Sequence, residues 1–504
     1  MITCSNRESS AHERAPVLDR RRMGVVLHPT SLPGPGACGR LGASAFRFVD
    51  FLVESGLSVW QVLPLGPTHV LRSPYEGLSA HAGDPALICL KAYSPRNRHA
   101  PDYGPDGKRR LTLDEGRVQQ ACRDFAGSAN AGERRAFGEF CEGARAWLED
   151  YALFRAVRAS RGEAPWWTWP EALRDRDRAA LEGAARRCAT AIEMYRFEQF
   201  QFHRQWHALK HYANQRDVLL FGDMPIFVAH DSAEVWAHRE VFLIDACGRP
   251  EVVAGVPPDA FSDTGQRWGT PLYDWVRLAQ VDFRWWVDRM ATQLGLFDLI
   301  RVDHFRGFQA YWEIAASDDT AINGHWVEGP GAELFEALTR QLGPLPLVAE
   351  DLGYITPEVH ALRERFGYPG MKVLQFAFDN DEHNPHLPSQ FVENCVVYTG
   401  THDNDTTLGW YLSLSAHARQ RVCEFLGEND ADMPWPLLRA ASASAARLAM
   451  APMQDLLGLD STHRMNTPGT VTGNWHWRFT WEQLPAELPG RLRALVEHDR
   501  RDGT

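Results

Sequence analysis

The sequence has no apolar stretch long enough to cross a membrane, and its first twenty residues lack the apolar core of a signal peptide. The net charge of -12 is dispersed, and no concentrated basic block is present, which disfavours a nucleic-acid partner. The nine cysteines are odd in number and form no C-x-x-C pair, which favours reduced thiols over disulfides or a zinc site. We therefore expect a cytoplasmic protein with neither a membrane nor a nucleic-acid partner.

Sequence signatures for metals and nucleotides are also missing. The chain has no EF-hand loop, no H-E-x-x-H motif, and no glycine-rich phosphate loop after its first apolar run. His203, His207 and His211 recur every four residues on an expected helix, but no acidic residue completes a ligand set at that spacing. A partly exposed helix face is the better interpretation of these histidines. The sequence predicts no metal and no cofactor.

Eight short apolar runs follow one another along the chain, many of them followed by a loop and a helical pattern. Continuous apolar runs are typical of parallel strands that are buried on both faces. Helical segments such as 283–295 and 333–343 supply crossovers between them. This pattern predicts a closed (β/α)8 barrel, with an open doubly wound sheet as the main alternative. The runs cover residues 23–29, 59–65, 218–226, 296–304, 346–353, 371–378, 395–403 and 448–457.

The segments between these runs are unequal in length. About 150 residues of mostly helical character follow the second run, too many for an ordinary connection in a barrel. We expect a mobile tail over residues 1–21 and a single barrel domain over residues 22–504. Inserted subdomains are expected at about 66–215, which is helical, and at about 228–280. The expected architecture is a TIM barrel with large, mostly helical insertions.

Four acidic residues come just after the apolar cores of their runs: Asp223, Asp303, Glu350 and Asp403. In a barrel the carboxyl ends of the strands meet at one rim, where such enzymes place their chemistry. A pair of carboxyl groups can cleave a glycosidic bond, with one group acting as the nucleophile and the other as the general acid/base. A metal site is the competing use of clustered carboxylates, and solvated strand ends are the structural alternative.

The segment LIRVDHFRG, residues 299–307, passes from an apolar run directly into charge. Arg301 and Asp303 are two residues apart, so on a strand they point to the same face. Arg301 would hold Asp303 ionised, as a nucleophile requires. Glu350, if less well paired and close to that negative charge, would have a raised pKa and could donate a proton.

Nine long blocks of the chain resemble segments of one enzyme family in the expected order. The chain resembles the amylomaltases, the 4-α-glucanotransferases of glycoside hydrolase family 77, over nearly its whole length after about residue 22. The blocks include GDMPIFVAHDSAEVW, FDLIRVDHFRGFQAYW, VAEDLGYITPEV and YTGTHDNDTTLGW. The nine blocks cover residues 24–35, 73–85, 222–236, 255–275, 297–312, 348–359, 367–378, 398–410 and 466–478.

The resemblance implies a role for each residue of the three acidic blocks. It assigns Asp303 of R-x-D-H-F-R-G as the nucleophile and Glu350 of A-E-D-L-G as the acid/base. Asp403 of G-T-H-D-N-D would bind sugar hydroxyls, distort the ring and stabilise the transition state. Arg301 and His402 keep their family positions beside these groups.

The resemblance also implies residues that bind substrate. The loop over 255–275 would overhang the acceptor side, with Pro258 stiffening it, and with Gln266 and Trp268 offering a hydrogen-bonding group and a flat face. The other implied substrate-binding residues are Tyr75, Asp223, Asn474 and Trp475.

The chain departs from the usual family pattern at three places. His81 and Asp84 replace a phenylalanine and an asparagine, and residues 36–40 replace Y-G-I-G-D. These departures lie outside the three acidic blocks. They put in doubt the contacts of the outer donor subsites.

The implied reaction is transfer of a segment of an α-1,4-glucan to the 4-hydroxyl of glucose or of another glucan. It would proceed with retention and without a cofactor, as disproportionation of maltooligosaccharides or as cyclisation within one chain. One alternative is an α-amylase-like hydrolase, which the stiff, aromatic loop over 255–275 disfavours because it would crowd out water. The other is a glycan-binding protein without catalysis, which the intact Asp303, Glu350 and Asp403 disfavour.

Overall fold

A computed structural model describes residues 20–90, 115–259, 262–379, 381–427 and 432–502. The tail expected over 1–21 therefore lies almost wholly outside the described residues. Within those ranges, no helix is both long enough and apolar enough to span a membrane. Arg21 donates hydrogen bonds to the backbone carbonyls of Ser442, Ser444 and Asp499, so the start of the described chain is tied to its C-terminal part.

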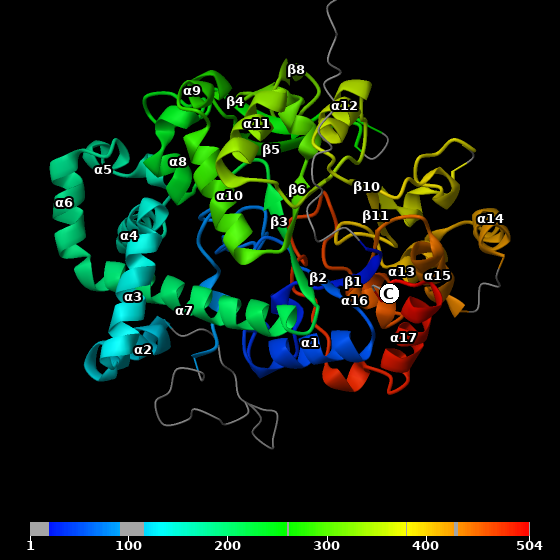
Figure 1. The fold of residues 1–504 in the computed structure, drawn as a ribbon. Helices are drawn as coiled ribbons and strands as arrows, with labels where there is room; N and C mark the ends of the chain where they lie inside the picture. The colour runs from blue at the N-terminus through cyan, green and yellow to red at the C-terminus, as the bar shows by residue number, and fades with distance from the viewer. Residues whose placement is uncertain (1–19, 91–114, 260–261, 380, 428–431, 503–504) are drawn as a thin grey trace, which may run out of the picture.

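Eight parallel strands close into a barrel, in the order β1-β12-β11-β10-β9-β6-β3-β2 and back to β1 (Figure 1). Each strand overlaps one of the eight apolar runs, so the predicted (β/α)8 barrel is confirmed and the open sheet is wrong. The strands are β1 (Arg22–Val26), β2 (Val59–Gln61), β3 (Leu219–Pro225), β6 (Leu299–Asp303), β9 (Leu347–Ala349), β10 (Gly370–Val373), β11 (Cys395–Tyr398) and β12 (Leu448–Pro452).

Helices pack around the strands and form the outer layer of the barrel (Figure 1). Their apolar faces follow the helical period, as in α1, where Ala45, Phe48, Val49 and Leu52 are buried. The two crossovers expected from the sequence are α10 and α11. The helices of this layer are α1 (Ala43–Glu54), α10 (Arg284–Leu296), α11 (Gly331–Leu342), α12 (Pro357–Arg365), α13 (Thr407–Ser413), α14 (Ala416–Leu426), α15 (Trp435–Ala443), α16 (Met453–Leu456) and α17 (Leu488–His498).

The described part of the insertion between β2 and β3 is mostly helical, as expected. His203 lies on α7 with its ring centroid 5.2 Å from that of Phe140 and 5.8 Å from that of Trp147. No group of three or more His, Cys, Asp or Glu residues in the described chain could hold a metal ion. The helices are α2 (Glu115–Ser128), α3 (Ala131–Gly143), α4 (Arg145–Ser160), α5 (Glu171–Arg174), α6 (Arg178–Arg187) and α7 (Ala189–Asn214).

A second, antiparallel sheet with the order β5-β4-β7-β8 lies beside the barrel. It combines the segment 228–280 with the connection that follows β6, and the sequence analysis did not foresee it. The reason is that half of the residues of β5 and half of those of β8 are exposed, so neither strand leaves an apolar run. Its strands are β4 (Val252–Val256), β5 (Gln266–Pro271), β7 (Ala310–Ala315) and β8 (His325–Glu328), accompanied by α8 (Ala233–Ala237) and α9 (Trp275–Gln280). The domain bounds themselves stay a prediction.

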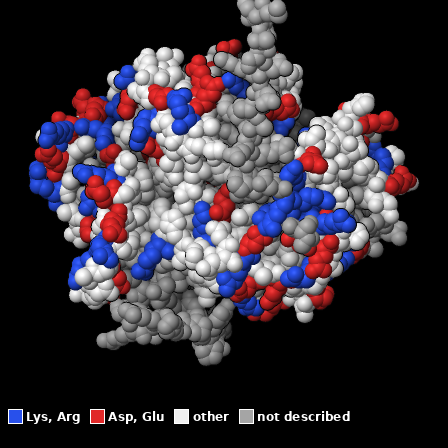
Figure 2. All heavy atoms as spheres, viewed as in Figure 1, with Lys and Arg blue, Asp and Glu red and all other residues white. Residues whose placement is uncertain are grey.

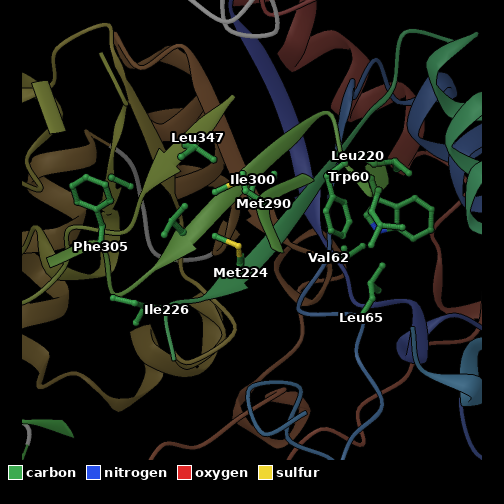
Figure 3. Close-up of a cluster of buried hydrophobic side chains, with 14 of the residues drawn as sticks. Trp60, Val62, Leu65, Leu220, Met224, Ile226, Met290, Ile300, Phe305 and Leu347 are labelled. Atoms are coloured by element: carbon green, nitrogen blue, oxygen red, sulfur yellow. The ribbon is translucent and has the colours of Figure 1, made fainter. Parts of the chain in front are cut away.

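The barrel strands are buried on both faces, which divides the core into two layers. One layer lies inside the barrel and includes Val26, Val59, Phe221, Leu299 and Val348. The other lies between the strands and the surrounding elements (Figure 3), with Trp60, Val62, Leu65, Leu220, Met224, Ile226, Met290, Ile300, Phe305 and Leu347 labelled there.

The period of two along β6 directs its polar side chains into the barrel. Leu299 belongs to the interior cluster, whereas Ile300 and Val302 belong to the outer one. Arg301 and Asp303 therefore share the inward face with Leu299, nearer the carboxyl end of the strand. On the face seen in Figure 2, Lys and Arg side chains are interspersed with Asp and Glu side chains.

Candidate active site

Arg301 joins the inward faces of two neighbouring barrel strands. Its Nη1 donates to both carboxylate oxygens of Asp223 on β3, at 2.7 and 2.9 Å. Its Nη2 lies 2.8 Å from Oδ1 of Asp303. The Asp223 side chain is 0% exposed, whereas that of Asp303 is 29% exposed. Asp223 thus anchors the guanidinium from within, and Asp303 is the member of the trio that a substrate can reach.

The charges of this trio support one another. Burial alone would lower the pKa of Arg301, but the carboxylates of Asp223 and Asp303 hold that pKa well above its usual value. Burial raises the pKa of Asp223, and the charge of Arg301 opposes this effect. The positive charge of Arg301 therefore pairs with two carboxylates at the mouth of the barrel.

Two backbone amides hold the carboxylate of Glu350, just beyond β9. Oε2 accepts a hydrogen bond from the His304 amide at 2.7 Å, and Oε1 accepts one from the Leu352 amide at 2.8 Å. His304 has a φ of 52°, in the left-handed region, at the turn that follows Asp303. The Phe305 amide also donates to the Glu350 carbonyl, at 3.1 Å. The loops after β6 and β9 are thus bonded together around this carboxyl group.

The protonation of Glu350 differs from that of an ordinary glutamate. Burial raises its pKa to about 7, and Asp303 adds to the increase while Arg301 opposes it. Near neutral pH both its acid and its base forms are populated. A carboxyl group that can give and take a proton, beside an aspartate paired with a guanidinium, is the arrangement that a general acid/base and a nucleophile require.

Tyr75 extends the network from β3 to the loop after β11. Its hydroxyl donates to Oδ2 of Asp223 at 2.7 Å and lies 2.9 Å from Nε2 of His402. Burial raises the pKa of Tyr75 well above its usual value, with Asp223 contributing, so the hydroxyl keeps its proton. The ring of His402 stacks on that of Tyr75 at 5.3 Å between centroids, and its Nε2 lies 3.3 Å from Oδ2 of Asp403.

Asp403 is 47% exposed and is held by two residues, Arg464 and Asn466, that the sequence analysis did not assign to the site. Asn466 donates to its Oδ1 at 2.6 Å, and Arg464 donates to its backbone carbonyl at 2.9 Å. The only sequence signal for these residues is that Asn466 opens the matching block 466–478.

The two predicted residues of that block have different positions. The ring centroid of Trp475 lies 6.0 Å from those of both Tyr75 and His402, so the structure brings Trp475 to the site. Asn474 is buried, and within the described residues its side-chain hydrogen bonds go to Thr467 and Thr470. Asn474 therefore fixes the conformation of the loop that carries Trp475.

Gln266 and Trp268 lie together on β5 at the edge of the second sheet. Trp268 donates from Nε1 to Oε1 of Gln266 at 3.1 Å, and its ring meets His304 edge to face at 4.9 Å. Trp268 is 36% exposed, and through His304 it contacts the turn that follows Asp303. Pro258 is exposed just beyond β4, and residues 260–261 of the same loop lie outside the described ranges.

Two pockets open to solvent adjoin this network, and the volumes given for them include the open space at their mouths. One, of about 590 Å³, is lined by Tyr75, Asp223 and His81 together with residues of α10. The other, of about 430 Å³, is lined by His402, Arg464 and His28, and burial lowers the pKa of His28 to about 3, so its imidazole stays neutral.

The residues that depart from the family pattern make internal contacts. Nδ1 of His81 lies 2.8 Å from Oγ1 of Thr292, and its ring stacks on Trp147. Asp84 accepts from the Ala86 amide at 2.8 Å and caps the short helical turn that follows. His81 reaches the larger cavity, so this departure alters the wall of a space that adjoins Tyr75 and Asp223.

Comparison with known proteins gives a consistent result. A family model described as 4-alpha-glucanotransferase matches residues 27–484. The chain is 49% identical to the 4-alpha-glucanotransferase of Thermus thermophilus over 95% of this chain and 99% of that protein. It is 46% identical to the 4-alpha-glucanotransferase of a Synechocystis strain over 95% and 98% of the two chains. Among solved structures, an amylomaltase from Streptococcus agalactiae in complex with acarbose matches with a TM-score of 0.90 and 35% identity, covering 96% of this chain and all of that one.

Proposed function

The chain belongs to glycoside hydrolase family 77, the family of 4-alpha-glucanotransferases, and on that premise we propose how its residues perform the reaction. The enzyme transfers a segment of an α-1,4-glucan to the 4-hydroxyl of glucose or of another glucan. It uses Asp303 as nucleophile, Glu350 as acid/base and Asp403 as the residue that stabilises the transition state.

In the first half of the reaction, the Asp303 carboxylate attacks the anomeric carbon of the donor. Glu350 gives its proton to the glycosidic oxygen, so the leaving chain departs with a free 4-hydroxyl. A covalent glycosyl ester on Asp303 results. Asp403 binds hydroxyl groups of the reacting sugar and stabilises the positive charge that develops on its ring.

In the second half, the Glu350 carboxylate takes the proton from the 4-hydroxyl of the acceptor. That oxygen attacks the anomeric carbon, and the bond to Asp303 breaks. Two inversions at one carbon give net retention, and the acid form of Glu350 is restored. When the acceptor is the far end of the same glucan, the product is a cycle.

The observation that carries this proposal is the contrast between the two carboxyl groups. The Arg301 guanidinium lies 2.8 Å from Asp303, whereas burial raises the pKa of Glu350 to about 7. Asp223, Tyr75 and His402 act as positioning and substrate-binding residues through the network that they share with Arg301. The reaction needs neither a metal nor another cofactor, because the two carboxyl groups supply both the nucleophile and the proton.

Transfer to a sugar must compete with hydrolysis of the glycosyl ester. A bound and oriented acceptor can reach an effective molarity of about 10⁵ M or more, which exceeds the concentration of water. We assign the acceptor side to Gln266, Trp268, Pro258 and their loop, and the donor side to Tyr75 with Trp475 and Asn474.

Incubation of the purified protein with maltotriose, followed by separation of the products, tests the function. A ladder of longer oligosaccharides together with glucose demonstrates transfer. Glucose and maltose alone would show an α-amylase-like hydrolase, and unchanged maltotriose would show a glycan-binding protein without catalysis.

We also infer a cytoplasmic location. The cysteines within the described residues are all free thiols, as in proteins of reducing compartments.

A further inference from the structure

The ring of Tyr354 is exposed at the rim of the site. Tyr354 is 76% exposed and lies between Glu350 and α12, in the loop after β9. A large aromatic ring left in water forgoes the free energy of burial. Beside a binding site, such a ring offers a flat apolar face to a ligand.

Two contacts hold this segment against the loop that carries the nucleophile. Arg306, three residues after Asp303, donates from Nη1 to the Tyr354 carbonyl at 2.6 Å. Its guanidinium carbon lies 5.6 Å from the centre of the Tyr354 ring and 3.7 Å from that of Trp326. Trp326 in turn packs edge to face on Trp312, at 5.1 Å. The ring of Tyr354 therefore has a supported inner face and a free outer one.

The ring of Tyr354 lies near the residues that we assign to the acceptor side. The second sheet has the order β5-β4-β7-β8, with Trp268 on one edge strand and Trp326 on the other. Three strand spacings of about 4.8 Å separate the edges, which is enough for a short run of sugar rings. Trp268 contacts His304 and Tyr354 contacts Arg306, so both aromatic groups border the same turn after Asp303.

We propose that the outer face of Tyr354 is a stacking platform for the acceptor glucan, several sugar units beyond the acceptor sugar next to Trp268. This inference rests on the proposed function and extends its acceptor side. The apolar face of a glucose ring, which carries C–H groups, fits the electron-rich face of an aromatic ring. The platform takes an α-1,4-glucan of several units and leaves glucose, which is too short to reach it, unaffected.

The test compares acceptors of different length at one fixed donor concentration. With Tyr354→Ala, the KM for maltopentaose as acceptor should rise about tenfold, the change expected when an aromatic face of this size loses its contact. The KM for glucose as acceptor and the kcat for both should stay within about twofold of the wild type. Tyr354→Phe and Tyr354→Trp should keep the wild-type KM, because stacking needs the ring and not the hydroxyl.

The substitution leaves the Arg306 bond in place, because that bond goes to the backbone carbonyl. Phe425→Ala is the matched control, since Phe425 is 47% exposed on α14, away from β8 and α12 (Figure 1). An equal rise in KM for glucose and maltopentaose, or no rise for either, would contradict the proposal that Tyr354 stacks on a long acceptor. Absence of transfer by the wild type would instead overturn the proposed function, so the two failures are distinguishable.

Discussion

Arg301 contacts the proposed nucleophile Asp303, and Tyr354 contacts the loop that follows it, but the first side chain is buried and the second is exposed. Arg301 is 5% exposed, and two carboxylates from neighbouring strands take up its charge. Tyr354 is 76% exposed and offers a free ring to solvent. The centre thus contains charged groups that contact one another, whereas the rim that we propose for the acceptor presents an aromatic ring to solvent. Substitutions in the centre should change the chemistry itself, and substitutions on the rim should change which acceptor is used.

The largest effect is expected for Asp303→Asn. The amide has nearly the shape of the carboxylate but cannot form the glycosyl ester, so kcat should fall by on the order of 10⁴-fold or more. Rates of disproportionation measure the loss, and thermal unfolding should show a folded protein. Asp124→Asn on the exposed face of α2 is the matched control. Near-normal turnover by a homogeneous preparation would remove Asp303 from the role of nucleophile.

Glu350→Gln should slow natural oligosaccharides by about 10²–10⁴-fold, the usual contribution of a general acid. A glycosyl fluoride has a leaving group that needs no proton, so its first step should be spared. The glycosyl-enzyme should then accumulate on Asp303 and be visible as an increase in intact mass. Equal losses on both donors would mean that Glu350 has a structural role.

The pH dependence should follow the raised pKa of Glu350, which is about 7. The first step needs the protonated form, and that form is lost as the pH rises through this value. We therefore expect kcat/KM for maltotriose to fall about tenfold per pH unit above about 7. The glycosyl fluoride reaction of Glu350→Gln should lack this alkaline limb. If the rate of the variant still fell above about pH 7, a group other than Glu350 would be responsible for the pH dependence.

The smallest effect is expected at the rim. Trp268→Ala should raise the ratio of hydrolysis to transfer several-fold, because it weakens the hold on the acceptor without touching Asp303. Free reducing ends compared with disproportionation products, at several acceptor concentrations, measure the ratio. Trp167→Ala in the helical insertion is the control for loss of a partly exposed tryptophan. If both rates fell together at a constant ratio, the loop would clamp substrate in general and would not select the acceptor.

Much of the barrel could be predicted because its strands are buried on both faces. Burial requires continuous apolar runs, and all eight were visible in the sequence. The second sheet could not be predicted in the same way, since β5 and β8 each expose half of their residues. The same limit applies to Tyr354, because a tyrosine in a loop carries no signal of whether its ring is buried or free.

The sequence by itself determined that Arg301 and Asp303 share one face of β6, since side chains two residues apart on a strand point to the same side. Only the tertiary structure decided their partners. Tyr75 and His402 are 327 residues apart in the chain and meet because the barrel closes. Asn466 reaches Asp403 across 63 residues, and the left-handed turn at His304 aims a backbone amide at Glu350. Such contacts depend on the distance between loops in space, and that distance leaves no periodic pattern in the order of the residues.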